Sequence, residues 1–535
     1  MSEYRPIAQI FCRYIHKPLP KHFRPGQGFI DSGARRDTHF TVKSHASLDI
    51  SLSPGQLVRV GRSIEHNDIA ILHPYISRRH FVIYSIEYEE GIQPLLYVRD
   101  YNSLCGTYVD GPCPRPMKVS PSSGYLLGQG EIIRIQPYWE FHVYLLGTQQ
   151  IGPTMSQLRP SETDLFQTRF LITEQILGSG ALAAVYLAVN LKTGRQVACK
   201  IHRLDRFRRL QRSSSTIRRI LHETNILSRL THPNILQFVA AFRSSNTLYT
   251  FTELAMGGDL FSMRLNYPDS LLEMDTKLII RQIVEAISYL HEQNIAHRDL
   301  KPENVFFATG PTFTTRVIVG DLGLAKTAIS GRMTSEVGTQ RFMAPEVYRG
   351  QCYGTEVDIW SIGMISLFLV ALDWNSLGCF EAFDQSAVDE SLMAVFDDLS
   401  GQGKALSNDF RDFIRRCLSV APSKRMTAEV SKGHTWFRSS GPQLKGNIEE
   451  FTRGWKPSRT VHNSVEDLDL LESIRAQNMP SPMSPEKRKA HDQTDIVEDP
   501  EISHYFMNGD STRHKRQKVL PAQLPPVIKM TGIYE

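Results

Sequence analysis

The sequence has no long apolar run, no paired-cysteine motif and no large excess of charge of one sign. The longest apolar stretch, Ile362 to Leu372, is too short to span a bilayer, and no apolar leader follows the first residues. The seven cysteines are scattered without a CxxC pair, which argues for a reducing compartment and against structural zinc. A net charge of +5 over 535 residues is too small to indicate a nucleic-acid binder. We therefore expect no secretion, no membrane association and no direct contact with nucleic acid.

Residue composition and hydrophobic periodicity change several times along the chain, so we expect a multidomain protein. Residues 1–148 contain short alternating segments such as QLVRVGR, FVIYSI and LLYVRD between turns, which predicts an all-β sandwich. Residues 149–169 are polar and aperiodic, as in a linker. Residues 170–437 pass from a β-rich stretch to long helical patterns. Residues 438–535 have few large apolar side chains, which predicts a disordered regulatory tail with one short helix near Val465 to Ile474.

A glycine-rich segment lies near the start of the 170–437 region. The stretch ILGSGALAAVYLAV has the pattern of a strand, a turn and a strand, with Gly178 and Gly180 at the turn. Glycine lets backbone N–H groups approach nucleotide phosphates, which a Cβ atom would obstruct. In VACK, Lys200 stands on a strand of apolar neighbours, where a cation needs an anionic partner. Glu223, on the helix predicted for HETNILSRL, can be that partner.

Further charged motifs follow in a fixed order. HRDLKPEN supplies Asp299, Lys301 and Asn304, and DLG supplies Asp321. Phosphoryl transfer requires Mg²⁺ held by hard oxygen ligands, a role that suits Asp321 and Asn304. Asp299 suits the carboxylate that accepts the proton of the attacking hydroxyl, and Lys301 suits the cation beside the phosphate oxygens.

These motifs, in this order and spacing, resemble those of the eukaryotic protein kinases over residues 170–437. The resemblance implies a two-lobed α+β kinase domain with ATP and Mg²⁺ in the cleft between the lobes. It also implies that Thr252 is the gatekeeper, that Asp358 braces the catalytic loop and that Arg425 pairs with Glu346. The residues that it implies at the ATP site are Leu177, Gly178, Gly180, Val185, Lys200, Glu223, Glu253, Ala255 and Asp259.

Two positions depart from the kinase pattern. Ala183 stands where a third glycine is usual, and Leu322 replaces the usual phenylalanine of the metal-binding triplet. Neither change removes a charged catalytic group. Because Lys200, Asp299 and Asp321 are all present, we expect an active enzyme.

Substrate preference is indicated by two acidic residues. Lys301, in HRDLKPEN, is typical of the serine/threonine kinases. Asp259 and Glu303 resemble the acidic pair with which basophilic kinases bind arginine N-terminal to the phosphoacceptor. This resemblance predicts protein substrates with arginine three residues before the acceptor.

The amino-terminal sandwich resembles a forkhead-associated (FHA) domain over residues 57–147, through VGR, ISRRH and DYNSLCGTYVDG. In that family, loops at one end of the sandwich bind phosphothreonine, and the resemblance implies that Arg62, Ser77 and Arg78 do so here. Arg78 and Leu104-Cys105 depart from the family's usual residues, and the change at 104–105 removes an asparagine that bonds peptide backbone. A sandwich without a ligand is the alternative.

The order of the two modules is similar to that of the FHA-domain checkpoint kinases, the checkpoint kinase 2 group with its fungal and meiotic relatives. This similarity implies recruitment by phosphothreonine-containing proteins and a role in DNA-damage or meiotic recombination signalling in the nucleus. The tail clusters at 487–489 and 513–518 fit nuclear import signals. The alternative is an FHA scaffold with a catalytically silent kinase-like domain.

The activation segment suggests how the kinase is switched on. In kinases with an arginine before the catalytic aspartate, as Arg298 is here, that arginine commonly binds a phosphate on the activation loop. Ser335 has Arg332 three residues before it, so it matches the predicted specificity of the same enzyme, and Thr334 is the neighbouring candidate. These residues predict trans-autophosphorylation in a transient homodimer. The alternative is that Ser335 is an ordinary loop hydroxyl.

Overall fold

The computed structural model contains one compact unit, Met1–Asn478, and a second, Met479–Glu535, that lies outside the described residues. The two basic clusters of the tail belong to the second unit. The residues that the structure describes are 6–14, 40–42, 48–88, 93–113, 115–146, 159–179, 183–205, 213–266, 271–310, 312, 314–322, 326–327, 341–371, 384–457 and 465–478.

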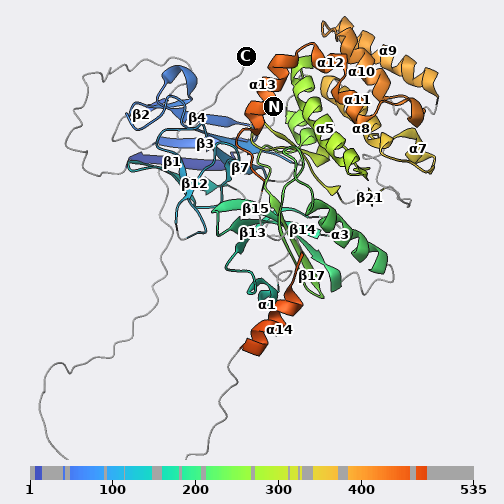
Figure 1. Ribbon diagram of the computed structural model, residues 1–535. Helices are drawn as coiled ribbons and strands as arrows, with labels where there is room; N and C mark the ends of the chain where they lie inside the picture. Colours follow the sequence, from blue (N-terminus) through green and yellow to red (C-terminus); the bar gives the residue numbers. More distant parts are fainter. Residues whose placement is uncertain are drawn as a thin grey trace, which may run out of the picture. The chain divides into compact units, whose positions relative to one another are not determined.

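Two sheets form the amino-terminal sandwich (Figure 1), as the alternating segments predict. The first sheet has the order β3 (Leu48–Leu52), β1 (Ala8–Tyr14), β12 (Trp139–Leu145), β11 (Ile132–Ile135), β8 (Tyr108–Asp110), β9 (Met117–Lys118). The second has the order β10 (Tyr125–Leu126), β7 (Leu95–Asp100), β6 (Phe81–Ile86), β4 (Leu57–Gly61), β5 (Ile69–Ile71), β2 (Phe40–Val42), and the short 3-10 helix η1 (Ile64–His66) joins β4 to β5.

The core of the sandwich lies between these sheets. Phe81 and Phe141 are fully buried there and meet edge to face at 5.1 Å. Alternation of β-branched and aromatic residues supplies one inward side chain in two, which is the period of a strand. Segments that the sequence predicted as strands therefore pack as a sandwich.

Strand β6 is buried on both of its faces, which alternation alone does not predict. Val82, Tyr84 and Ile86 point away from the sandwich core and share an apolar cluster with Leu187 and Met256 of the following domain. The hydroxyl of Tyr84 donates to the Met256 carbonyl at 2.7 Å, and burial raises the pKa of this phenol. This face of the sandwich is thus a contact surface inside the chain.

The small lobe of the second domain is a sheet with helices beside it (Figure 1). Its order is β13 (Phe170–Ser179), β14 (Ala183–Asn190), β15 (Arg195–Arg203), β17 (Thr247–Glu253), β16 (Phe238–Arg243), β22 (Val465–Asp467), with the helices α1 (Pro160–Thr163) and α3 (Ser213–Leu227). All pairs are antiparallel except β16 with β22, which is parallel.

The large lobe is mostly helical, as the 3.6-residue pattern predicts. Helix α8 is buried along almost its whole length, and among the described residues no helix is long and apolar enough to cross a membrane. The elements of this lobe are α4 (Leu260–Asn266), α5 (Glu273–Glu292), β18 (Ile295–Ala296), η3 (Pro302–Asn304), β19 (Val305–Phe307), β20 (Val317–Val319), β21 (Lys326–Thr327), α7 (Pro345–Tyr348), α8 (Glu356–Val370), α9 (Gln385–Gly401), α10 (Asn408–Cys417), η5 (Pro422–Lys424), α11 (Ala428–Lys432), α12 (Thr435–Arg438) and α13 (Gly441–Thr452).

Two segments expected to lack structure are ordered where the structure describes them. In the predicted linker, Phe166 is buried and stacks on Phe242 of β16 at 4.6 Å. In the predicted tail, α13 buries Leu444, β22 joins the small-lobe sheet, and α14 (Leu468–Asn478) follows at the place where a short helix was expected. The expectation of disorder is therefore corrected for residues 438–457 and 465–478, because a few apolar side chains suffice to dock a segment on an existing core.

Candidate functional site

The catalytic loop is held by one buried carboxylate. Asp358, at the start of α8, accepts backbone N–H groups of His297 and Arg298, each at 2.8 Å, and contacts His291 Nε2 at 2.8 Å. Burial raises the pKa of Asp358. His291, His297 and the N–H group of Arg298 lower this pKa by more than burial raises it, so the net shift is downward. An ionised Asp358 thereby fixes Arg298 in the left-handed backbone region, at φ 70°.

This loop brings together the residues predicted for phosphoryl transfer. Lys301 Nζ lies 3.2 Å from Asp299 Oδ2, and Asn304 Nδ2 donates to the same oxygen at 3.1 Å and to the Asp299 carbonyl at 2.7 Å. The 3-10 turn η3 places these side chains on one side of the loop. A carboxylate fixed in this way can orient a hydroxyl and accept its proton.

The small lobe contributes a half-buried cation. Lys200 Nζ on β15 lies 3.2 Å from Glu223 Oε1 on α3 and 3.6 Å from Asp321 Oδ1 after β20. Burial lowers the pKa of Lys200, but Asp321 and Glu223 raise it more, so the lysine stays charged. Three elements that are distant in sequence thus meet at one ammonium group.

The register of the small-lobe sheet aligns the other residues implied for ATP. Gly178 pairs with Val185, and Val185 pairs with Lys200, so the three lie in one row across β13, β14 and β15. A Cβ atom on Gly178 would meet nothing within 4 Å, which leaves room for a phosphate chain to approach the backbone. Gly180 lies outside the described residues.

The segment that joins the lobes follows β17. The side chain of Glu253 is engaged, because it accepts Arg316 Nη2 at 2.5 Å and the Gln237 N–H at 2.9 Å. Its backbone and that of Ala255 are therefore what this segment can offer to an adenine ring. Thr252 is buried near the end of β17. Leu177 is partly buried and packs against the apolar cluster that includes Leu187 and Met256.

The two acidic residues predicted to bind arginine differ in their hydrogen bonding. Asp259 is 8% exposed, and its two carboxylate oxygens accept the N–H and the hydroxyl of Ser262, so it caps α4. Glu303 Oε2 is buried without a hydrogen-bond partner among the described residues. Burial raises the pKa of Glu303, and Asp259 and Asp299 add to the increase although Lys301 lowers it. Glu303 is thus the carboxylate that a bound cation would stabilise, by supplying the missing hydrogen bond and an opposite charge.

A small pocket adjoins the catalytic loop. Beside it, Arg425 and Glu346 form a buried ion pair at 2.7 Å that ties α7 to the loop after η5. The pocket is lined by Arg298, Asp299, Leu300, Lys301, Phe342, Met343, Ala344, Val347, Val357 and Ser361.

The sandwich joins its predicted phosphopeptide residues at one end. The Arg62 N–H donates to the Ser77 carbonyl at 2.8 Å, and Ser77 Oγ accepts the Leu104 N–H at 3.0 Å. Arg62 and Arg78 are exposed, and Leu104 is 91% exposed. Gly61 allows this closeness, because a Cβ there would lie 2.5 Å from the Arg78 carbonyl.

Asp100, behind these loops, was not singled out from the sequence. Asp100 accepts Ser103 N–H and Oγ and Thr107 Oγ1, at 2.6 to 2.7 Å, and so fixes the loop that carries Leu104. Likewise His80, fully buried, accepts the Ser77 N–H at Nδ1 and contacts the Gly106 carbonyl. The pattern D-x-x-S, with an acidic residue at a strand end, was the available signal.

The donor set of the cleft suits a nucleotide and a divalent cation. Lys200 can pair with phosphate oxygens, and Asp321, with its side chain 48% exposed, can offer carboxylate oxygen. Since Nδ2 of Asn304 donates to Asp299, the side-chain amide oxygen of Asn304 is the atom that can bind a cation. The residues present therefore fit ATP with Mg²⁺.

Comparison with known proteins agrees with this geometry. The model of the protein kinase domain matches residues 171–437, and that of the FHA domain matches residues 58–136. The meiosis-specific serine/threonine-protein kinase mek1 of Schizosaccharomyces pombe is 32% identical over 414 residues, which are 75% of this chain and 85% of the relative. MEK1 of Saccharomyces cerevisiae, also described as meiosis-specific, is 28% identical over 428 residues, 73% of this chain and 82% of the relative.

Among solved structures, a crystal structure of Rad53 residues 1–466 in complex with AMP-PNP covers 80% of this chain and 99% of its own, at 23% identity and a TM-score of 0.40. The catalytic geometry, the two matched domains and the kinase from S. pombe lead to one conclusion. The chain belongs to the ATP-using serine/threonine protein kinases that carry an FHA domain.

Proposed function

We propose that this kinase is recruited to phosphothreonine-containing proteins by its FHA loops and phosphorylates sites with arginine three residues before the acceptor. The observation that carries the substrate preference is the buried Glu303 Oε2 without a partner among the described residues. The meiosis-specific role named for both yeast relatives supports a setting in DNA-damage or meiotic recombination checkpoint signalling. The basic clusters at 487–489 and 513–518 support action in the nucleus.

Catalysis would use the side chains around the cleft. Lys200, held by Glu223, orients the phosphate chain, and Asp299 accepts the proton of the substrate hydroxyl as Lys301 steadies the transferred group. Asp321 and Asn304 would hold Mg²⁺, which when bound neutralises charge on the phosphate oxygens. The two positions with unusual residues keep this scheme intact, because Leu322 is buried in the large-lobe core and Ala183 continues β14.

Preference for arginine follows from electrostatics. A buried carboxylate oxygen without a partner is unfavourable, and a guanidinium in its plane supplies both the charge and the hydrogen bonds that it lacks. Asp259 contributes mainly as a fixed negative charge, because Ser262 already occupies its oxygens.

Replacement Glu303→Ala should lower kcat/KM for a peptide with arginine at −3 by about tenfold and leave a peptide with alanine at −3 almost unchanged. The raised pKa of Glu303 adds a pH dependence: as the pH falls through that pKa, the carboxyl becomes neutral and the preference declines. Glu449→Ala, on the exposed surface of α13, is the matched control. Peptide-array profiling is the measurement, and a wild-type enzyme indifferent to arginine at −3 would refute the proposal.

The FHA loops support recruitment, because they present two exposed arginines beside a serine hydroxyl. Arg62→Ala should weaken binding of a phosphothreonine peptide at least about tenfold without lowering the melting temperature of the protein. Arg59→Ala is the control, since Arg59 lies on β4, which ends one residue before Arg62, and pairs with Asp68. Titration calorimetry gives the affinities, and equal binding by wild type and Arg62→Ala would favour a sandwich without a ligand.

Activation by phosphate is supported by the state of Arg298. Its Nε atom is buried without a hydrogen-bond partner among the described residues, and its guanidinium lies over the Tyr353 ring at 5.2 Å. Thr334 and Ser335 lie outside the described residues, so the proposal of trans-autophosphorylation in a transient homodimer rests on the sequence and on this arginine. A phosphate of charge near −2 on the activation segment would supply the hydrogen-bond acceptor that Arg298 Nε lacks among the described residues.

The double variant Thr334→Ala/Ser335→Ala should lack activation-segment phosphate and lose about tenfold or more in activity. Activation of wild-type protein should be second order in protein concentration, and the inactive variant Asp299→Ala should accept phosphate only from an active copy. Mass spectrometry with a concentration series provides the data. Full activity of the double variant, or first-order activation, would contradict this mechanism.

A further inference from the structure

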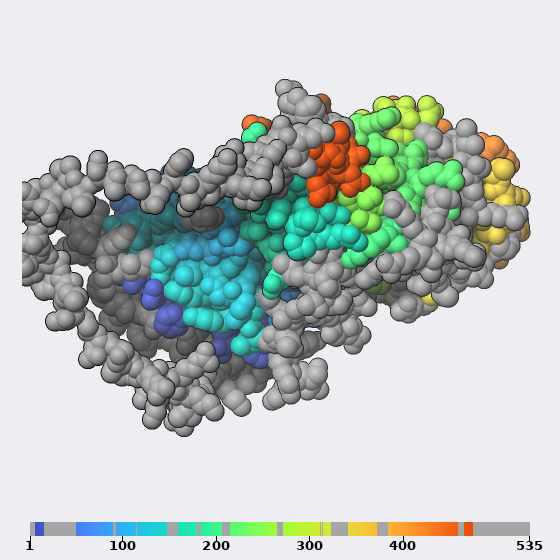
Figure 2. Space-filling model, turned by 90° about the horizontal axis from the view of Figure 1, so that it is seen from below, coloured from blue at the N-terminus to red at the C-terminus, as the bar shows by residue number. Residues whose placement is uncertain are grey.

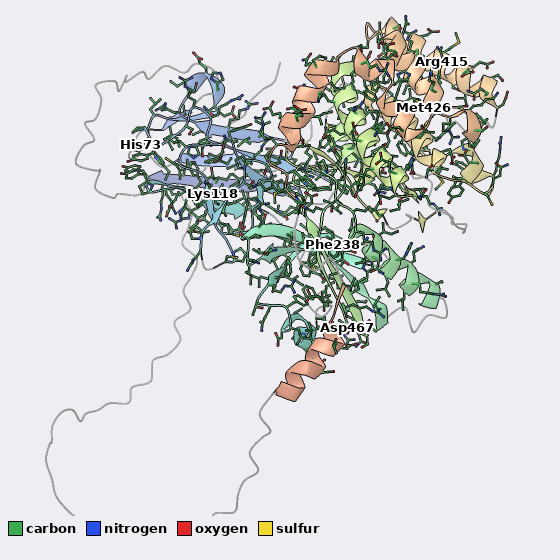
Figure 3. All side chains as sticks on the ribbon, in the orientation of Figure 1. His73, Lys118, Phe238, Arg415, Met426 and Asp467 are labelled. Atoms are coloured by element: carbon green, nitrogen blue, oxygen red, sulfur yellow. The ribbon has the colours of Figure 1, made fainter. Side chains whose placement is uncertain are left out.

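The segment that follows the kinase domain returns to the small lobe as a strand. Val465–Asp467 forms β22, which pairs in parallel with β16 in the register Ala241 to Val465, Phe242 to Glu466 and Arg243 to Asp467. The strand covers the edge of β16 that would otherwise expose its N–H and C=O groups. In Figure 3, Phe238 marks the first residue of β16, and Asp467 marks the end of β22.

Two anchors hold this segment in place beyond the strand pairing. Arg169 Nη1 donates to both carboxylate oxygens of Glu466, at 2.6 and 2.9 Å. Leu468 is 1% exposed in the cluster of Phe166 and Phe242, on the outer side of the sheet. Figure 2 shows the orange-red surface of this segment lying against teal and green surface of the small lobe.

Val465 packs against the large core that includes Phe238 and Ala241 of β16, and also against a smaller cluster on the side of α3. It packs against the group formed by Leu204, Ile220 and Leu248, to which Ile217 and Leu221 also belong as partly buried members. Ile220 and Glu223 are three residues apart on α3, so both lie on neighbouring parts of one helix face. A contact that holds this face inward also holds the carboxylate that pairs with Lys200.

We propose that Val465 is a positioning residue for phosphoryl transfer: β22 supports α3 from the edge of the sheet, and α3 in turn keeps Glu223 on Lys200. The segment from 465 to 478 is thus a built-in activating element of the kinase domain.

The proposal is tested in the full chain with one substitution at two sites. Val465→Asp should lower kcat at least about tenfold with the peptide KM changed less than about twofold, because a misplaced Glu223 impairs transfer and leaves the peptide site intact. Leu470→Asp is the matched control, since Leu470 lies on the same segment with 60% exposure, and its kcat should equal that of wild type. Val465→Ile should retain activity.

Hydrogen exchange and rescue separate positioning from general stability. In Val465→Asp, amides of α3 should exchange faster while those of α5 keep their protection. A synthetic peptide of residues 465–478 added in excess should restore activity, and the same peptide with aspartate at the first position should not. Unchanged kcat in Val465→Asp, loss of protection in both helices, or failure of the peptide to rescue would each overturn the proposal.

Discussion

The pairing of the partly buried Lys200 ammonium with two carboxylates is the constraint on which the kinase domain depends. A cation removed from water costs several kcal/mol unless carboxylates compensate for the lost hydration. The two compensating carboxylates, Glu223 and Asp321, lie on different elements from the lysine and from each other. Sheet, α3 and the segment after β20 must therefore come together, and the arrangement that satisfies the lysine is also the one that can bind a phosphate chain.

The large lobe solves a related problem with hydrogen bonds. Asp358 is fully buried, and the N–H groups that it accepts belong to the two residues before Asp299. Fixing the backbone there lets Lys301 and Asn304 converge on Asp299 without a search of side-chain conformations at each turnover. The Asp299 carboxylate is thus held through main-chain geometry set by α8, and the buried pair Arg425–Glu346 ties the neighbouring α7 into the same lobe.

Local patterns predicted most of the fold and the catalytic residues, because each depends on neighbours close in sequence. The segments FVIYSI and LLYVRD coincide with β6 and β7. The segment HRDLKPEN contains both the turn η3 and the Asn304 amide group that donates to Asp299. Distant contacts were beyond such patterns. Three residues, VED, have no detectable period, and their partner strand lies more than 200 residues earlier. For the same reason the engagement of Asp259 by Ser262 and the second buried face of β6 appear only in three dimensions.

The most direct test of this account is transfer of radiolabelled phosphate from ATP to an arginine-containing peptide by the purified full-length protein. The geometry predicts robust incorporation by wild type and a loss of at least about a hundredfold in Asp299→Ala, whose proton acceptor is missing. Glu223→Gln should also reduce incorporation, because the amide cannot balance the charge of Lys200. Equal incorporation by wild type and Asp299→Ala, or none by wild type, would contradict the account.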